Sequence, residues 1–84
     1  MIKKGWLPVD VKPGLFSSER SVTFDTGKAK YSLIVDQADL SGGNLAVYIV
    51  AEQGNEAVIA LPRETFTSGS RVRVPREVVK TSRR

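Results

Sequence analysis

Apolar and polar residues alternate along almost the whole chain, and no other feature restricts its fold as much. Successive side chains of a β-strand point to opposite faces, so a period of two predicts strands that bury one face. No stretch of the sequence carries the continuous apolar stripe that an amphipathic helix needs. The 84 residues suffice for one domain with one small core. We therefore expect a single all-β domain.

The clearest pair of strands is a hairpin within residues 21–35. A two-residue turn at Thr26-Gly27 places Phe24 opposite Ala29. This register gathers the apolar side chains on one face and the charged and hydroxyl side chains on the other, as a sheet with one buried face requires.

Residues 45–51 and 57–61 form a second expected hairpin, with its turn at Gly54-Asn55. Both segments are apolar at nearly every position, so neither face is marked as the outer one. Strands of this kind are central in a barrel or sandwich, or another subunit covers one of their faces. A protein interface here has four candidate residues, which are Trp6, Tyr48, Val50 and Ile59.

One phrase occurs twice near the C-terminus, as LPRETF at residues 61–66 and as VPREVV at residues 74–79. Proline removes a backbone donor and ends sheet pairing, and it suits the first position of a helical turn. We expect each copy to be the end of a strand, a short helical turn after Pro62 or Pro75, and an apolar residue that returns to the core.

The segment 69–79, GSRVRVPREVV, resembles the end of an SH3-like barrel, where a Pro-led helical turn follows a strand and an apolar pair re-enters the sheet. The aromatic motif and acidic loop with which SH3 domains bind proline-rich peptides are missing, so the resemblance implies a fold and no ligand. The expected fold is a small SH3-like barrel or compact β-roll of about five antiparallel strands over residues 1–79. Residues 80–84 are expected to form a flexible basic tail, and two further strands are expected over residues 6–12 and 71–74.

The sequence contains no His and no Cys. The commonest general bases, thiol nucleophiles and transition-metal ligands are thereby missing, and we expect neither an enzyme nor a cofactor or metal site. No stretch approaches the roughly 20 apolar residues of a membrane span, and no apolar run follows the first lysines as in a signal peptide. We expect a cytoplasmic protein without a membrane partner.

The net charge of +4 is unevenly distributed. Residues 31–62 contain no Lys or Arg, whereas residues 63–84 contain seven. A basic strand and tail suit the phosphates of a nucleic acid. The candidate polyanion-binding residues are Arg71, Arg73, Arg76, Lys80, Arg83 and Arg84. Sequence alone places no aromatic residue beside these cations, and stacking aromatics are what a single-strand binding surface also needs.

Two functions therefore remain. The first is a non-catalytic protein-binding or structural module, with a protein partner or a homodimer formed through the apolar hairpin. The alternative is binding to the phosphate backbone of a nucleic acid through the basic C-terminal strand and tail.

Overall fold

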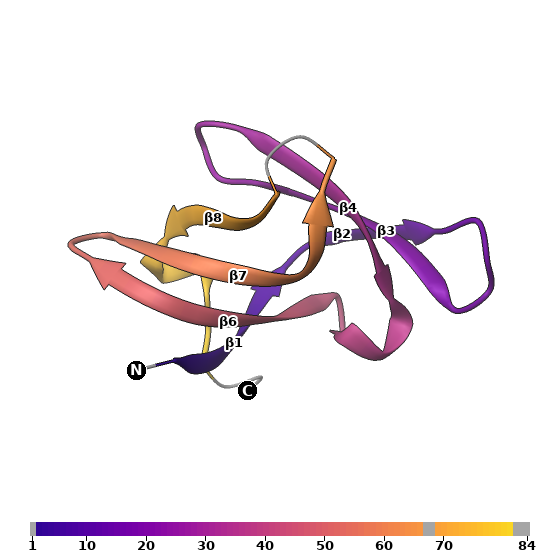
Figure 1. The fold of residues 1–84 in the computed structure, drawn as a ribbon, viewed down its shortest axis with the longest axis horizontal. Coiled ribbons are helices and arrows are strands. Elements are labelled where there is room, and N and C mark those ends of the chain that lie inside the picture. The colour runs from indigo at the N-terminus through magenta and orange to yellow at the C-terminus, as the bar shows by residue number, and fades with distance from the viewer. Residues whose placement is uncertain (1, 67–68, 82–84) are drawn as a thin grey trace.

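The computed structural model describes residues 2–66 and 69–81, and these form two antiparallel sheets (Figure 1). The five-stranded sheet has the order β1-β6-β7-β8, with β5 also paired to β6, and the three-stranded sheet has the order β2-β3-β4. The strands of the larger sheet are β1 (Lys3–Pro8), β5 (Leu40–Ser41), β6 (Asn44–Gln53), β7 (Glu56–Thr65) and β8 (Gly69–Pro75). Those of the smaller sheet are β2 (Asp10–Pro13), β3 (Glu19–Asp25) and β4 (Lys30–Asp36), and two 3-10 turns complete the fold, η1 (Gln37–Asp39) and η2 (Arg76–Val78).

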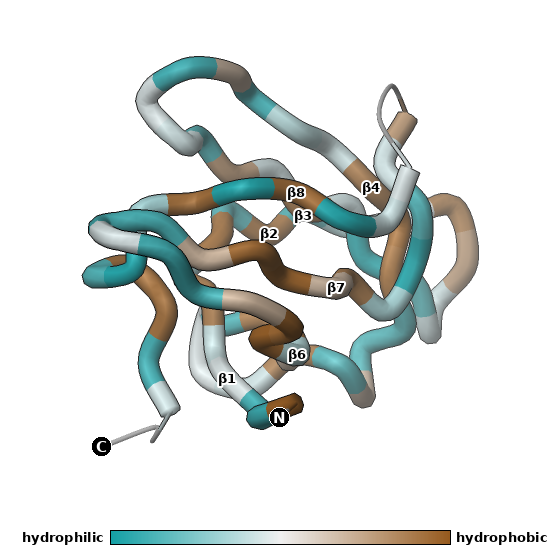
Figure 2. The backbone as a smooth tube through the Cα atoms, turned by 60° about the vertical axis from the view of Figure 1, so that its left-hand side comes forward, coloured by the Kyte–Doolittle hydropathy of each residue, from teal (hydrophilic) through white to brown (hydrophobic). Residues whose placement is uncertain are grey.

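The core lies between the sheets and is built from alternate positions of their strands. Val22 and Leu33 from the smaller sheet and Leu45 and Ile59 from the larger sheet are completely buried. Figure 2 shows hydrophobic residues recurring along β6, β7 and β8. The expected all-β class is confirmed, but the strands pair as two sheets and no closed barrel is found among the described residues.

The expected first strand is two strands, because the chain changes sheets at Val9. β1 pairs with β6 in the larger sheet, and β2 pairs with β3 in the smaller one. Between them, the Val9 amide donates to the Gly43 carbonyl at 3.1 Å. Pro8 ends β1 at this point, in agreement with its lack of a backbone donor.

The β3–β4 hairpin turns one residue later than the sequence predicted. The Thr26 amide donates to the Ala29 carbonyl at 2.9 Å, so the turn is centred on Gly27-Lys28. Phe24 consequently lies opposite Tyr31 rather than Ala29. Glycine is needed at the first turn position because its φ is +89°. Every partner moves by two residues, so the predicted faces are kept although the register was wrong.

The β6–β7 hairpin turns at Gly54-Asn55 as predicted, with Gln53 opposite Glu56. Its two faces differ, contrary to the expectation from sequence. Ile59 lies on the inner face and is completely buried, whereas Tyr48 on the outer face is 53% exposed. Ile59 is therefore a core residue and not part of an accessible interface.

The two copies of the repeated phrase have different structures. After Pro75 the chain forms η2, as predicted. After Pro62 it forms no helical turn, because β7 continues through Pro62 to Thr65 with a break in its pairing to β8. The end of β7 instead turns towards β4 (Figure 1), where the Phe66 amide donates to the Ser32 carbonyl at 3.0 Å.

The C-terminal segment returns to the first strand. Val79 is buried in the core, and Lys80 exchanges two backbone hydrogen bonds with Trp6, at 2.7 and 3.0 Å. Lys80 therefore belongs to the folded domain and not to the expected tail, of which residues 82–84 lie outside the described part of the chain. Neither of the two helical turns described is long or apolar enough to span a membrane.

Candidate functional site

One row of side chains crosses the outer face of the five-stranded sheet. Lys4 on β1 lies opposite Tyr48 on β6, Tyr48 lies opposite Ala60 on β7, and Ala60 lies opposite Arg71 on β8. Neighbouring strands are about 4.8 Å apart, so the row is about 14 Å long. We call these four residues the outer row. It places an exposed aromatic ring between two cations.

The two cations of the outer row are available to a ligand. Lys4 and Arg71 are exposed and form no ion pair with a carboxylate of the described residues. The Lys4 Nζ lies 5.0 Å from the centre of the Trp6 ring, on the same face of β1. An ammonium group over an indole ring is held by a cation–π attraction that leaves its charge intact.

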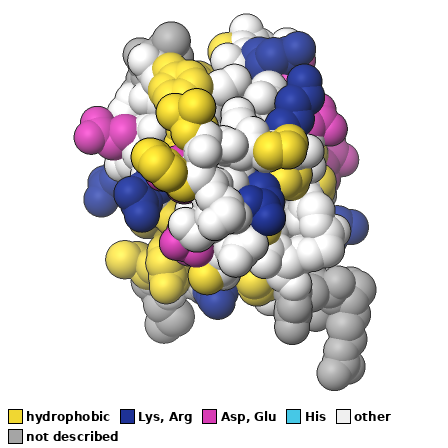
Figure 3. All heavy atoms as spheres, turned by 90° about the vertical axis from the view of Figure 1, so that its right-hand side faces the viewer, with side chains coloured by type: hydrophobic (Ala, Val, Ile, Leu, Met, Phe, Trp, Pro, Cys, Tyr) yellow, Lys and Arg dark blue, Asp and Glu magenta, His cyan; other side chains and the backbone are white. Residues whose placement is uncertain are grey.

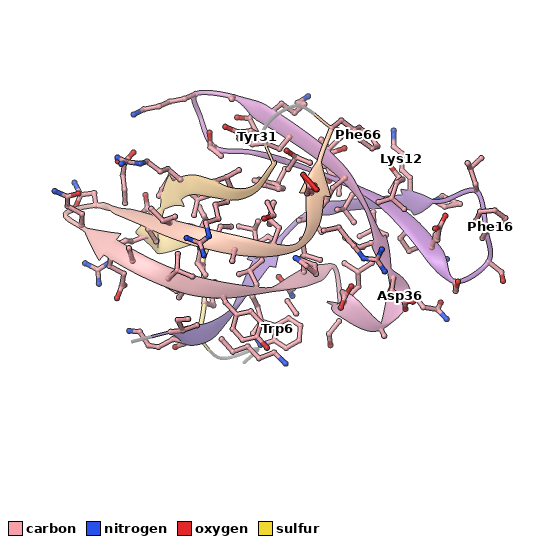
Figure 4. All side chains as sticks on the ribbon, in the orientation of Figure 1. Trp6, Lys12, Phe16, Tyr31, Asp36 and Phe66 are labelled. Atoms are coloured by element: carbon pink, nitrogen blue, oxygen red, sulfur yellow. The ribbon has the colours of Figure 1, made fainter. Side chains whose placement is uncertain are left out.

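Two small side chains lie beside Tyr48. Ala60 lies directly opposite it on β7, and Ala46 precedes it by two residues on the same face of β6. Ala46 in turn lies opposite Trp6, so Trp6 and Tyr48 are diagonal neighbours on adjacent strands, with Cα atoms about 7–8 Å apart. Figure 4 shows the Trp6 side chain beside β1 and β6. The centre of the face thus carries the small apolar side chains of Ala46 and Ala60, with aromatic rings and cations around them.

A second group of charges lies at the hairpin end of this face. The Glu56 carboxylate forms an ion pair with Arg73, in which the Arg73 Nη1 lies 3.6 Å from the Glu56 Oε1. The same carboxylate pairs with Lys28 from the β3–β4 turn, with Nζ 3.5 Å from Oε2. Two cations from different sheets therefore converge on one carboxylate, and their positive charge is partly neutralised.

The structure divides the six predicted polyanion-binding residues. Arg71 and Arg73 share the outer face, as their spacing on one strand predicted. Arg76 and Lys80 line a separate open hollow of about 890 Å³ between the β6–β7 turn and η2. Arg76 is engaged there, since its Nε lies 3.1 Å from Glu52 and its Nη1 donates to the Gly54 carbonyl at 3.2 Å. Arg83 and Arg84 lie outside the described residues.

Glu52 is the acidic centre of that hollow. Its carboxylate pairs with Lys3 at 3.3 Å and with Arg76. The hydrogen bond and charge of Lys3, followed by the charge of Arg76, hold the pKa of Glu52 below its ordinary value of 4.5. Three charged residues of this hollow, Lys3, Glu52 and Arg76, pair with one another, so their charges are less available to a ligand than those of the outer row.

Of the predicted interface residues, Trp6 and Tyr48 share the outer face, Val50 is half-buried at a bulge in β6, and Ile59 is in the core. The sequence reasoning missed Lys4, Lys28 and Glu56. Their relevance follows from pairing across strands and between sheets, which the alternation of residues along one strand does not show.

The loop between β2 and β3 forms a second exposed apolar feature. Leu15 is 93% exposed and Phe16 is 68% exposed. The loop is nevertheless held by hydrogen bonds, because the Arg20 guanidinium donates to the carbonyls of Ser17 at 2.8 Å and Glu19 at 2.7 Å. Figure 3, which views the molecule from this end, shows hydrophobic side chains on the surface near Lys and Arg side chains.

Among the described residues, no group of three or more His, Cys, Asp or Glu side chains is placed to hold a metal ion. Comparisons with protein-family models, with curated proteins and with solved structures gave no match to this chain.

Proposed function

We propose that the protein is a non-catalytic module that binds single-stranded nucleic acid on the outer face of the five-stranded sheet. The observation that carries the proposal is the outer row, in which exposed Tyr48 lies between Lys4 and Arg71, two exposed cations that form no ion pair within residues 2–66 and 69–81. Single-strand binding surfaces combine aromatic rings, on which bases stack, with cations that contact the phosphates. Arg71 was identified from the sequence, and the sheet register supports adding Lys4 as the second cation and Tyr48 as the aromatic partner.

The shape of the face favours single strands over duplexes. A base stacks on an aromatic ring only where the ring is accessible from above, and the small side chains of Ala46 and Ala60 leave that space beside Tyr48. In a duplex the bases are already stacked on one another, so only the two cations would contribute. We therefore expect the affinity for a duplex to be lower than for a single strand, and to be lost more completely when the salt concentration is raised.

Fluorescence anisotropy of labelled single-stranded and duplex oligonucleotides, at low and near-physiological salt, tests the proposal. Tyr48→Ala should cost about 1–3 kcal/mol of binding free energy to the single strand, the usual contribution of one stacked base. Arg71→Glu should weaken binding and flatten its dependence on salt, because a phosphate contact is lost and an anion is added.

Two matched controls lie away from the outer row and are labelled in Figure 4. Phe66→Ala removes another exposed aromatic ring, and Lys12→Glu reverses an exposed cation of the smaller sheet. Both should bind like the unmodified protein. The proposal is rejected if Tyr48→Ala and Phe66→Ala lose equal amounts of affinity for the single strand. It is also rejected if the unmodified protein does not bind at low salt.

A second candidate function is a protein-binding module, and the ordered loop bearing Leu15 and Phe16 favours it. Exposed apolar residues on a loop fixed by hydrogen bonds are typical of anchors for a protein partner. Failure of all oligonucleotide binding, together with a partner that is lost on Phe16→Ser, would favour this candidate.

A further inference from the structure

We infer that Arg73 and Lys28 form a second phosphate subsite, which the carboxylate of Glu56 occupies in the free protein. The inference rests on the proposed function and extends the same face. Its basis is the convergence of two cations, from β8 and from the β3–β4 turn, on the two oxygens of a single anion. A phosphate group offers the same kind of partner, with oxygens that accept from both cations at once.

The position of the subsite is set by the sheet register. Arg73 lies two residues from Arg71 on β8, so both side chains project from the same face. Arg73 is opposite Val58, and Arg71 is opposite Ala60, which is the β7 residue of the outer row. A strand whose base stacks on Tyr48 and whose phosphate binds Arg71 therefore continues towards Arg73 and Lys28.

The carboxylate can be displaced because all three side chains are accessible. The exposed fractions of the Lys28, Arg73 and Glu56 side chains are 86%, 69% and 40%. Exposed ion pairs of this kind contribute little to stability, since water screens the charges and two long side chains must be ordered. A phosphate that approaches the subsite thus competes with a weakly held internal anion, and Glu56 lowers the affinity without blocking the site.

Glu56→Gln tests the inference, and Glu52→Gln is its matched control. Both glutamates pair with two cations at the protein surface, and both substitutions raise the net charge by one. Only Glu56 lies beside the outer face, so a general effect of charge appears equally in both variants. The measurement is the affinity for a labelled oligothymidylate over a series of salt concentrations.

For Glu56→Gln we expect an affinity about two- to fivefold higher than that of Glu52→Gln, the range expected for one exposed ion pair. The slope of log affinity against log salt should steepen by about 0.7 for each additional phosphate that the protein neutralises. Adding Arg73→Gln or Lys28→Gln to Glu56→Gln should remove most of the increase in affinity.

The outcomes separate this inference from the proposed function. In one outcome the unmodified protein binds clearly while Glu56→Gln and Glu52→Gln show equal affinities and equal salt slopes. That result overturns the subsite and leaves the outer row in place. An increase in the affinity of Glu56→Gln that survives Arg73→Gln and Lys28→Gln also overturns it. Absence of binding by the unmodified protein and by both Gln variants overturns the subsite and the proposed function together.

Discussion

At the scale of single residues, Gly5 shows how closely the C-terminal segment packs on β1. A Cβ atom at this position would lie 2.8 Å from the Cγ1 of Val79 and 3.3 Å from the Cδ1 of Ile49. Such distances are too short for carbon atoms in contact, so the neighbours would have to move. The absence of a side chain at residue 5 is what lets Val79 reach the core.

We predict that Gly5→Ala lowers the free energy of unfolding by about 1–3 kcal/mol, the usual cost of overpacking a core. Val79→Ala should also destabilise, through lost burial, but the double variant should be more stable than the sum of the single effects implies. Urea denaturation of the four proteins measures the coupling. Simple additivity would contradict the close contact between these two positions.

Glu52 makes stability depend on pH in a defined direction. Its pKa is lower in the folded protein than the ordinary 4.5 of an unfolded chain, owing to Lys3 and then Arg76. The folded state therefore gains stability above pH 4.5, and it loses this stability as the pH falls through the lowered folded pKa. At neutral pH the contribution is fully present.

We predict that unmodified protein is more stable than Glu52→Gln at neutral pH, and that the difference shrinks as the solution is acidified below pH 4.5. Urea midpoints at a series of pH values measure it, and the other carboxylates cancel in the comparison. A difference that grows on acidification would show that the sign of the pKa shift is wrong.

At the scale of elements, turns and registers explain what the sequence could and could not predict. The alternation of apolar residues correctly predicted strands and the inner faces of β3 and β4. Which face a residue occupies follows from its own hydrophobicity and its place in the alternation, and does not depend on the pairing register. The centre of the β3–β4 turn was missed because it depends on local hydrogen bonds. The Asp25 carboxylate accepts from the Gly27 amide at 2.7 Å, and the Thr26 hydroxyl accepts from the amides of Lys28 and Ala29.

The candidate site, too, could be predicted only in part from the sequence. The cations Arg71 and Arg73 were identified from their spacing on one strand, whereas the position of Tyr48 between Lys4 and Arg71 depends on three strand pairings. The β6–β7 strands are apolar on both faces, so the pattern offered no basis for choosing the outer one. The long continuation of β7 past Pro62 was likewise hidden from the sequence, because β7 runs on through the proline with a break in its pairing to β8 instead of turning.

The turn itself gives a prediction at this scale. Gly27→Ala should destabilise the protein by about 1 kcal/mol or more, because the native φ of +89° is unfavourable for a residue with a Cβ. No atom lies within 4 Å of the Cβ position, so the cost is one of backbone conformation and not of packing. Thermal unfolding measures it, with Lys28→Ala as the comparison at the other central position. Equal stability of Gly27→Ala and the unmodified protein would contradict the assigned turn.

At the scale of the whole molecule, the charges on the outer face oppose association between copies. A face-to-face pair would bring the exposed Lys4 and Arg71 of each copy towards those of the other, without the phosphates that a nucleic acid provides. Like charges facing one another at an interface are unfavourable. This repulsion argues against self-association through the outer face and agrees with the polyanion ligand that we propose for it.

We predict that the free protein scatters light as a monomer of 9.2 kDa at low ionic strength. Raising the salt concentration screens the repulsion and is the condition under which self-association through this face would appear. Light scattering after size-exclusion chromatography measures the mass. A stable dimer at low salt that Tyr48→Glu dissociates would assign the face to a homodimer instead.

The pairing of Trp6 with Lys80 has a consequence for the architecture of larger proteins. The chain enters the fold on β1 and leaves it on the neighbouring antiparallel segment, so its entrance and exit lie side by side. A unit connected in this way can be inserted into a surface loop of a host domain, because the host's chain is interrupted and resumed at nearly the same point. Inserted in this way, the fold would carry its outer face into the host, connected to it by two adjacent strands.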